Sequence, residues 1–401
     1  MSPPTSAPTV IGGALAVLGL PSAVAGAYLG GLAVLARRRP APAPSDATRF
    51  DVIVPAHNEA AGIASTVTSL LNVDYPRDRF RVVVVADNCS DDTADRARAA
   101  GATVLERHDL TLRGKGYALA HAYDACLAEG FADAIVVVDA DTVVTPNLLG
   151  AFAARFAAGA ECVQASYLVR NTADGWRTRL MSVAFTMYHT VRSLGRERLR
   201  LSAGLRGNGM GFTPSLIRRV PHEAYSIVED VEYAVALGLA GVRVVYVDEA
   251  VVYGEMPTGT AAATTQRERW ERGREALRRH VRPLLRGAAE RRDRVLLDLA
   301  LDLLVPPLTK LVVLAAGGFA LALLLRVLGL ATTAALATWS VGLLGLALYV
   351  ARGCMLSEAG PRVLLDLARA PLYIAWKMVL RLRRAPSAPG EWVRTRRAAE
   401  R

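Results

Sequence analysis

Three short apolar runs rich in β-branched residues each stop at a carboxylate or amide side chain, and this pattern constrains the fold most. Such runs are typical of buried strands in a parallel sheet, where ligand sites form at the carboxyl ends of the strands. Segments with helical character separate them, so the order is that of successive βαβ units. The runs and the polar residues after them are residues 50–54 before Asn58 and Glu59, residues 82–86 before Asp87, and residues 134–138 before Asp139 and Asp141.

The segments between and beyond these runs complete an α/β domain. A helix over residues 90–100 is predicted to open on Ser90-Asp91-Asp92-Thr93, which are good capping residues, and to stop at Gly101. The sequence therefore predicts a mostly parallel, doubly wound sheet in a domain that covers residues 50–294. The other expected helices are residues 59–71, 115–129, 181–194 and 231–240, and the other expected strands are residues 103–105, 162–169 and 242–247.

Three stretches are apolar and long enough to cross a bilayer, namely residues 10–36, 305–325 and 331–351. The first contains no charged residue, and Arg37-Arg38-Arg39 follow it directly. Because basic residues stay on the cytoplasmic side, the α/β domain is predicted to be cytoplasmic. A cleaved leader or a buried core helix is the alternative interpretation of the first stretch. A short turn separates the other two, which indicates a hairpin and predicts a multi-pass protein of the inner (cytoplasmic) membrane.

The segments around these stretches are predicted to be linkers, tails or helices at the membrane surface. Residues 361–384 are partly apolar but carry Arg362, Asp366, Arg369 and Lys377. That charge favours a helix lying in the interface over a fourth crossing, which is the alternative. The remaining parts are an N-terminal tail at residues 1–9, a basic and proline-rich linker at 37–49, an interfacial segment at 295–304 and a basic tail at 385–401.

The net charge of +11 is concentrated beside the membrane stretches. Residues 267–294 hold eleven arginines against five acidic residues. Basic clusters next to a bilayer are attracted to anionic lipid. Nucleic-acid binding is the rival explanation, but the sequence contains no recognition motif and no aromatic residues interleaved with the basic ones. Membrane lipids are therefore predicted partners, and nucleic acid is not.

Asp139 and Asp141 have the most informative chemistry of these polar residues. Alternate positions at a strand end place both carboxylates on one side, where they can share a divalent cation. Such a cation can neutralise the charge that grows on a departing diphosphate. The segment Asp139-Ala140-Asp141-Thr142 also resembles the nucleophile motif of haloacid-dehalogenase-type phosphatases. That motif usually opens the fold, whereas several βα units precede it here, so a phosphatase is the weaker alternative.

Two later segments carry further polar groups. Glu229 and Asp230 precede a predicted helix, where a carboxylate can act as a general base if burial or an acidic neighbour raises its pKa, or can simply cap the helix. Gln266, Arg269 and Trp270 share one helix face at spacings i, i+3 and i+4. Arginine can bind phosphate through two N–H groups, and tryptophan offers a flat face to a sugar ring. A basic amphipathic helix on the membrane is the alternative.

Together these motifs resemble the signature of membrane-bound family 2 glycosyltransferases. This group includes cellulose, chitin, hyaluronan and poly-N-acetylglucosamine synthases, and the ceramide glucosyltransferases are similar. The resemblance covers residues 50–274 and extends to the flanking membrane layout. It implies a GT-A fold, a nucleotide-sugar donor, a divalent metal (Mg²⁺ or Mn²⁺) and inversion at the anomeric carbon. The motifs that carry it are Asp87, Asp139-Ala140-Asp141, Glu229-Asp230 and Gln266-Arg267-Glu268-Arg269-Trp270.

The resemblance also implies a role for each matching residue. It makes Asp230 the general base with Glu229 beside it, Asp141 a metal ligand, and Asp139 a ligand of the metal and of the ribose. The acceptor is expected to meet Gly209, Met210 and Trp270. The first two lie in the glycine-rich segment 207–212, where the backbone can approach a ligand closely, and a structural turn is the alternative for that segment. The donor site is expected to include Pro55, Asn58, Glu59, Asp87, Lys115, Asp139, Gln266, Arg267, Arg269 and Trp270.

We therefore expect an enzyme that transfers a sugar from a UDP-sugar to a polysaccharide or a lipid-linked acceptor. Three membrane stretches are few for a polymer channel, which favours the alternative of a non-processive enzyme that glycosylates a ceramide, diacylglycerol or polyprenyl lipid. An alternative of another class is a catalytically silent membrane scaffold subunit. The sequence leaves open whether a partner subunit or a homo-oligomer is needed.

Overall fold

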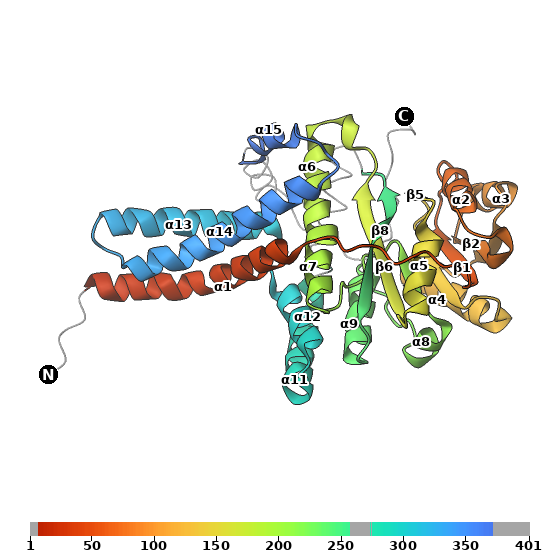
Figure 1. Cartoon of the computed structure of the whole chain (residues 1–401), viewed down its shortest axis with the longest axis horizontal. Helices are drawn as coiled ribbons and strands as arrows, with labels where there is room; N and C mark the ends of the chain where they lie inside the picture. The colour runs from red at the N-terminus through yellow and green to blue at the C-terminus, as the bar shows by residue number, and fades with distance from the viewer. Residues whose placement is uncertain (1–6, 257–272, 274, 372–401) are drawn as a thin grey trace.

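The computed structural model describes residues 7–256, 273 and 275–371 (Figure 1). An α/β domain lies at one end of the molecule, and a bundle of long apolar helices projects from it (Figure 1). The chain enters the domain after the first helix of the bundle and returns to the bundle after the last strand.

Among the described residues, eight strands form one mixed sheet. They are β1 (Phe50–Ala56), β2 (Phe80–Asp87), β3 (Thr103–Arg107), β4 (Ala134–Val137), β5 (Thr142–Val144), β6 (Cys162–Val169), β7 (Met210–Phe212) and β8 (Val244–Gly254). The strand order is β3-β2-β1-β4-β7-β6-β8-β5. Strands β3, β2, β1 and β4 are parallel, as are β6 and β8, whereas β5 and β7 run antiparallel to their neighbours. The predicted mostly parallel α/β sheet is confirmed. The sequence pattern does not predict β5 and β7, because each has only three residues.

Helices cover both faces of this sheet. Those of the domain are α2 (Ile63–Leu71), α3 (Thr93–Ala99), α4 (Lys115–Glu129), α5 (Leu148–Ala157), α6 (Trp176–Phe185), α7 (Arg192–Arg198), α8 (Pro214–Arg219), α9 (Glu229–Leu239), α11 (Val281–Arg291) and α12 (Arg294–Leu304). A π-helical turn, Thr186–Val191, joins α6 to α7. Side chains alternate along β1, so Val52 and Val54 enter a core with α2 and α5, while Ile53 enters a core with α4 and α9.

Three helices within the described residues are long and apolar enough to cross a membrane: α1 (Ala7–Leu35), α13 (Leu308–Val327) and α14 (Thr333–Leu356). Glycines allow α1 to pack closely on α14. A Cβ added at Gly26 would lie 2.4 Å from the carbonyl oxygen of Gly342, and one at Gly345 would lie 2.1 Å from that of Gly26. Small residues permit such an approach between apolar helices. The three helices lie on the three predicted apolar stretches, and their insertion into a bilayer stays a prediction.

Buried charges attach this bundle to the domain. Arg192 and Arg196 of α7 face Asp298 and Asp302 of α12, and all four are buried. Arg192 Nη1 donates to Asp302 Oδ1 at 2.7 Å, and Arg196 Nε lies 2.8 Å from Asp298 Oδ2. Tyr28 of α1 donates its hydroxyl to Asp298 at 2.8 Å, so the network joins three helices. We call the two arginines and two aspartates the junction cluster.

Two segments predicted to lie at the membrane surface also contact the domain. Helix α12 covers residues 295–304, and its aspartates face α7. Of residues 361–384 the structure describes those up to 371, and these contain the short helix α15 (Val363–Leu367). Asp366 in α15 accepts from Arg179 Nε of α6 at 2.6 Å. A location of either segment at a lipid surface stays a prediction.

Candidate active site

The carboxyl ends of β1, β2 and β4 meet at one edge of the sheet, where the candidate site is built. Ala56 at the end of β1 is level with Ala86 in β2, and β4 pairs with β1 on the other side. Neighbouring strands are about 4.8 Å apart, so the ends of β2 and β4 are separated by about 10 Å. This strand order brings Asp87 and Asp139 to the same edge, as the sequence predicts.

Lys115, the first residue of α4, lies at the centre of the site. Its Nζ donates to Asp139 Oδ1 at 2.5 Å and to the carbonyl oxygen of Gly207 at 2.5 Å. The same Nζ lies 3.5 Å from Glu229 Oε1. Burial alone would lower the pKa of Lys115, but the charges of Asp139 and Glu229 outweigh burial and raise that pKa. The side chain is therefore a positively charged ammonium group.

Gly207 brings Asp230 to the same place. Its φ is +77°, and a Cβ there would lie 3.5 Å from Asp230 Oδ2 and 3.6 Å from Lys115 Nζ. Glycine adopts this left-handed conformation without strain. We call the four charged side chains around this glycine the carboxylate cluster, which consists of Lys115, Asp139, Glu229 and Asp230.

Glu229 and Asp230 are the first two residues of α9. Burial raises the pKa of both carboxyl groups, because a carboxylate loses solvation inside the protein. The charge of Lys115 opposes this effect for both, and the backbone N–H of Val231 opposes it for Asp230. The pKa of each group is nevertheless raised. A carboxylate with a raised pKa accepts a proton more readily near neutral pH, as a general base must.

Asp139 and Asp141 lie in the turn between β4 and β5, and Asn208 holds this turn. Its Oδ1 accepts from the Asp139 N–H at 3.1 Å, and its Nδ2 donates to Thr142 Oγ1 at 2.8 Å. Both aspartates are half-buried. Within the described residues, no three His, Cys, Asp or Glu side chains gather as a metal site. Mg²⁺ is commonly held by one or two carboxylates together with the phosphates of its substrate, so this pair fits a metal that binds with a diphosphate.

Asp87 ends β2, and only 1% of its surface is exposed. Arg107, the last residue of β3, donates from Nη1 to Asp87 Oδ1 at 2.6 Å, and Asn88 Nδ2 donates to the same oxygen at 3.1 Å. The other oxygen, Oδ2, is buried and has no hydrogen-bond partner in the part of the chain that the structure describes. A ligand with a hydroxyl or N–H group can donate to it.

The end of β1 and the turn after it carry three of the predicted donor-site residues. Pro55 lies within β1. Asn58 has a φ of +55°, and its Oδ1 accepts from the Ser90 N–H at 2.8 Å, so it joins the turns that follow β1 and β2. The Glu59 N–H donates to Thr93 Oγ1 at 2.8 Å. These bonds shape the turn, and contact with a nucleotide stays a prediction.

Gly209 and Met210, which the sequence assigns to the acceptor site, lie inside the sheet. The Gly209 N–H donates to the Val137 carbonyl oxygen at 2.9 Å, and a Cβ at Gly209 would lie 2.9 Å from Ala165 Cβ. Met210 begins β7 and is 2% exposed. Acceptor contact by either residue stays a prediction. The other predicted site residues, Gln266, Arg267, Arg269 and Trp270, lie outside the described residues.

Three residues of the site were given no individual role from the sequence, namely Arg107, Gly207 and Asn208. Arg107 ends a strand, so the argument that led to Asp87 applies to it as well. Gly207 and Asn208 precede Gly209 in a glycine-rich segment that the sequence does mark. The pattern does not show which of those glycines faces the carboxylates, because that depends on how β7 inserts between β4 and β6.

Known proteins resemble this domain in sequence and fold. A model of the family described as "Glycosyltransferase like family 2" matches residues 47–273, more than half of the chain. The solved structure of the mannosyltransferase PcManGT from Pyrobaculum calidifontis in complex with GDP-Man and Mn²⁺ has a similar fold. It aligns with a TM-score of 0.53 and 19% sequence identity, over 89% of this chain and 99% of that chain.

Curated relatives carry glycosyltransferase or synthase names. The probable glycosyltransferase YdaM of Bacillus subtilis is 26% identical over 56% of this chain and 55% of its own length. The beta-monoglucosyldiacylglycerol synthase of Synechocystis sp. is 28% identical over 55% of this chain and 47% of its own length. The chain thus spans about half the length of these relatives. The family match over most of the domain that carries the carboxylate cluster shows that this chain belongs to glycosyltransferase family 2, and its fold is GT-A.

Proposed function

We propose that the chain is an inverting glycosyltransferase that moves a sugar from a UDP-sugar onto a polysaccharide or a lipid-linked acceptor. The observation that carries this proposal is the meeting of one ammonium and three carboxylates around Gly207. The cluster has an excess of negative charge at the carboxyl ends of the strands. That excess suits a metal-bound diphosphate on one side and a proton acceptor on the other.

The donor is proposed to bind between Asp87 and the turn that holds Asp139 and Asp141. Asp87 Oδ2 would accept from an N–H of the uracil or a hydroxyl of the ribose, while Arg107 fixes the other oxygen. Lys115 would place positive charge beside the diphosphate. Asp139 and Asp141 would hold Mg²⁺ or Mn²⁺, which when bound stabilises the charge that develops on the departing diphosphate.

Asp230 is the proposed general base. It would take the proton from the acceptor hydroxyl while that oxygen attacks the anomeric carbon. Burial favours this role, because it raises the pKa of Asp230. Glu229 is buried and faces the ammonium of Lys115, so we assign it to holding that cation. This division gives the two neighbouring carboxylates different roles.

The remaining donor contacts are proposed from the family resemblance. Gln266, Arg267, Arg269 and Trp270 would close the donor site, with Trp270 also bordering the acceptor. Pro55 and Glu59 would line the nucleoside pocket. Asn58 would hold the shape of the turn beside that pocket, since its side-chain oxygen accepts a hydrogen bond from the Ser90 N–H.

The acceptor is proposed to reach the site from the membrane, with the domain on the cytoplasmic face of the inner membrane. Three membrane-length helices are present in the described residues. This small number favours a glycolipid product, and one relative is named for the synthesis of a glucosylated diacylglycerol. Radiolabelled donor distinguishes the two outcomes, because a processive synthase gives a long polymer and a glycolipid enzyme gives a lipid with one or two sugars.

The function can be tested with the full chain in detergent with Mn²⁺, a panel of UDP- and GDP-sugars, and lipid extracts as acceptor. We expect release of UDP that stops when EDTA removes the metal. Asp230→Asn should lose turnover by about 10²- to 10⁴-fold while keeping donor affinity. Asp124→Asn, the same change on the exposed side of α4, should keep both.

Equal turnover in wild type and Asp230→Asn would refute the assignment of the base. Binding of donor without metal-dependent UDP release in the wild type would instead favour a silent scaffold subunit. Release of GDP but not UDP would overturn the proposed donor class and leave the assignment of the base intact.

A further inference from the structure

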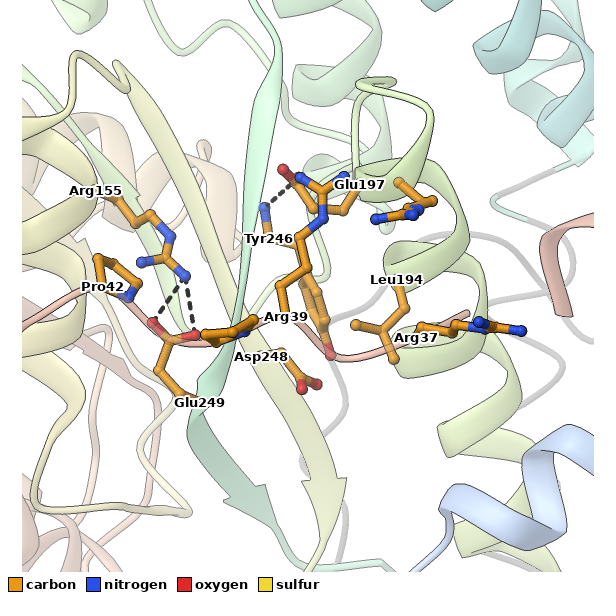
Figure 2. Close-up of a pocket in the computed structure, with 11 residues that line it drawn as sticks. Arg37, Arg39, Pro42, Arg155, Leu194, Glu197, Tyr246, Asp248 and Glu249 are labelled. Carbon is orange, nitrogen blue, oxygen red and sulfur yellow. Dashed lines mark hydrogen bonds and ion pairs between the residues drawn. The ribbon is translucent and has the colours of Figure 1, made fainter. Parts of the chain in front are cut away.

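Away from the candidate active site, a cavity lined mostly by charged residues lies between the segment that follows α1 and the surface of the domain (Figure 2). Its volume is about 260 Å³. Arg37 and Arg39 reach it from that segment, Arg155 from α5, and Arg198 from the end of α7. It shares no residue with the carboxylate cluster or with the turn that holds Asp139 and Asp141.

The acidic residues that line this cavity are already neutralised. Glu197 pairs with Arg243 at 3.0 Å, and Asp248 pairs with Arg38 at 3.1 Å. Glu249 pairs with Arg155 at 2.8 Å, as Figure 2 shows.

The other arginines on the cavity wall are not neutralised in this way. Arg37, Arg39 and Arg198 form no ion pair with any residue that the structure describes, and all three are exposed. The cavity therefore carries about three positive charges without compensating acids.

One of the lining residues also has a donor without a partner. Arg155 uses Nη2 to bind Glu249, while its Nη1 is buried and has no hydrogen-bond acceptor among the described residues. A buried donor left unbonded is unfavourable, so an anion that supplies an acceptor here would be stabilised. Guanidinium groups bind phosphate oxygens through two parallel N–H groups, which makes a phosphate ester the anion that this wall fits best.

The position of the cavity indicates where such a phosphate would come from. Helix α1 ends at Leu35, and Arg39 follows four residues later. Four residues span at most about 14 Å, so both Arg37 and Arg39 stay close to the end of the proposed membrane helix. Anionic phospholipid headgroups lie at that level of a bilayer and attract basic side chains.

We propose that this cavity is a binding site for a phosphate ester, presented by the headgroup of an anionic phospholipid beside α1. The lipid phosphate would contact Arg37 and Arg39 at the mouth and Arg198 at the end of α7. Occupation would hold the segment after α1 against β8 and α5, and so would help to fix the domain at the membrane surface. This inference depends on α1 crossing the membrane and not on the proposed donor or acceptor.

The test uses the full chain in nanodiscs of phosphatidylcholine with and without phosphatidylglycerol, followed by native mass spectrometry of the lipids that stay bound. We expect wild type to retain phosphatidylglycerol. Arg37→Ala/Arg39→Ala/Arg198→Ala should retain at least about tenfold less, since each basic residue near the surface contributes to the attraction. The control Arg278→Ala/Arg282→Ala/Arg286→Ala removes the same charge from exposed positions in or next to α11, which do not line the cavity, and should retain clearly more phosphatidylglycerol than the cavity variant. Thermal unfolding checks that both variants are folded.

Two measurements distinguish a phosphate carried by a lipid headgroup from a free phosphate ester. Calorimetry in discs of phosphatidylcholine alone tests binding of free glycerol 3-phosphate. Binding there that requires the three cavity arginines, without retained phosphatidylglycerol, would support the phosphate site and overturn the lipid source. Equal loss of lipid in the cavity variant and in the α11 variant would show general attraction and overturn the site. Retention unchanged in the cavity variant, with no arginine-dependent binding of the free ester, would also overturn it.

Discussion

The carboxylate cluster and the junction cluster both bury charged side chains, but only the first contains unequal numbers of acidic and basic groups. In the carboxylate cluster a single ammonium meets three carboxylates, and Asp230 and Asp139 stay half-exposed. In the junction cluster two guanidinium groups meet two carboxylates, and all four are buried. Balanced and fully buried charges hold helices together, whereas excess charge with an opening to solvent is available for a ligand or a proton. Net charge and exposure, rather than residue type, thus separate the two roles.

The largest effect is expected from Asp302→Ala in the junction cluster. It removes the carboxylate that binds both Arg192 and Arg196, at 2.7 and 2.9 Å, and leaves the buried guanidinium of Arg192 without its carboxylate, whereas Arg196 keeps Asp298. Loss of one partner of a buried ion pair destabilises by about 3–5 kcal/mol. Unfolding in mixed micelles with a denaturing detergent measures the change, and Asp124→Ala on the exposed side of α4 is the control. A stability equal to that of the control would contradict the structural role of this cluster.

The next effect is expected from Lys115→Met in the carboxylate cluster, and it is an effect on activity. The ammonium lowers the pKa of Glu229 and Asp230, so its removal should raise both. A base acts when deprotonated, and the rate falls as pH drops below its pKa. The acidic limb of the kcat/KM profile should therefore move to higher pH, and kcat/KM near neutrality should fall by about 10²-fold.

The pH profile of Arg218→Met, which removes an exposed cation from α8, serves as the comparison for this variant. An acidic limb that stays in place in Lys115→Met would show that the ammonium does not act on the base.

A smaller effect is expected from Gly207→Ala, because the added Cβ has ordinary contacts but φ is +77°. The left-handed conformation should destabilise the alanine variant by about 1–2 kcal/mol. Gly130→Ala has a matching φ of +65° at the end of α4 and nothing within 4 Å of its Cβ. Both variants should lose similar stability, but only Gly207→Ala should change kcat/KM, since relaxation of the strained backbone there would shift the chain beside Asp230 and Lys115. An equal kcat/KM in the two alanine variants would show that Gly207 is not part of the active site.

The smallest effect is expected from Asp95→Ala, which breaks an exposed i,i+3 pair with Arg98. Solvent and salt screen such pairs, so neither unfolding nor turnover should change measurably. A clear loss of stability would show that exposed ion pairs also stabilise the fold, and that burial does not separate structural charges from the others.

The residues at the strand ends could be predicted from the sequence, whereas most of their contacts could not. Asp87 and Asp139 were predictable because β-branched runs identify strands and parallel strands align their carboxyl ends. The start of α4 at Lys115 was also predictable, but its bond to Asp139 was not, since 24 residues separate them. The junction cluster escaped prediction because Arg196 and Asp298 lie far apart along the chain, and nothing local to either marks them as partners.

Local pattern alone determined the α/β class, the three membrane-length apolar helices and the family signature. Periodicity, the polar residues at strand ends and the length of apolar stretches are properties of contiguous residues, so they can be recognised without knowledge of the fold. Only the tertiary structure decided that Gly207 rather than Gly209 faces the carboxylates, that α12 buries its aspartates against α7, and that Arg37 and Arg39 line a cavity with Arg198. The physical reason is that net charge, burial and the direction of a side chain are set by residues distant in the sequence, which meet only when the sheet and the bundle pack.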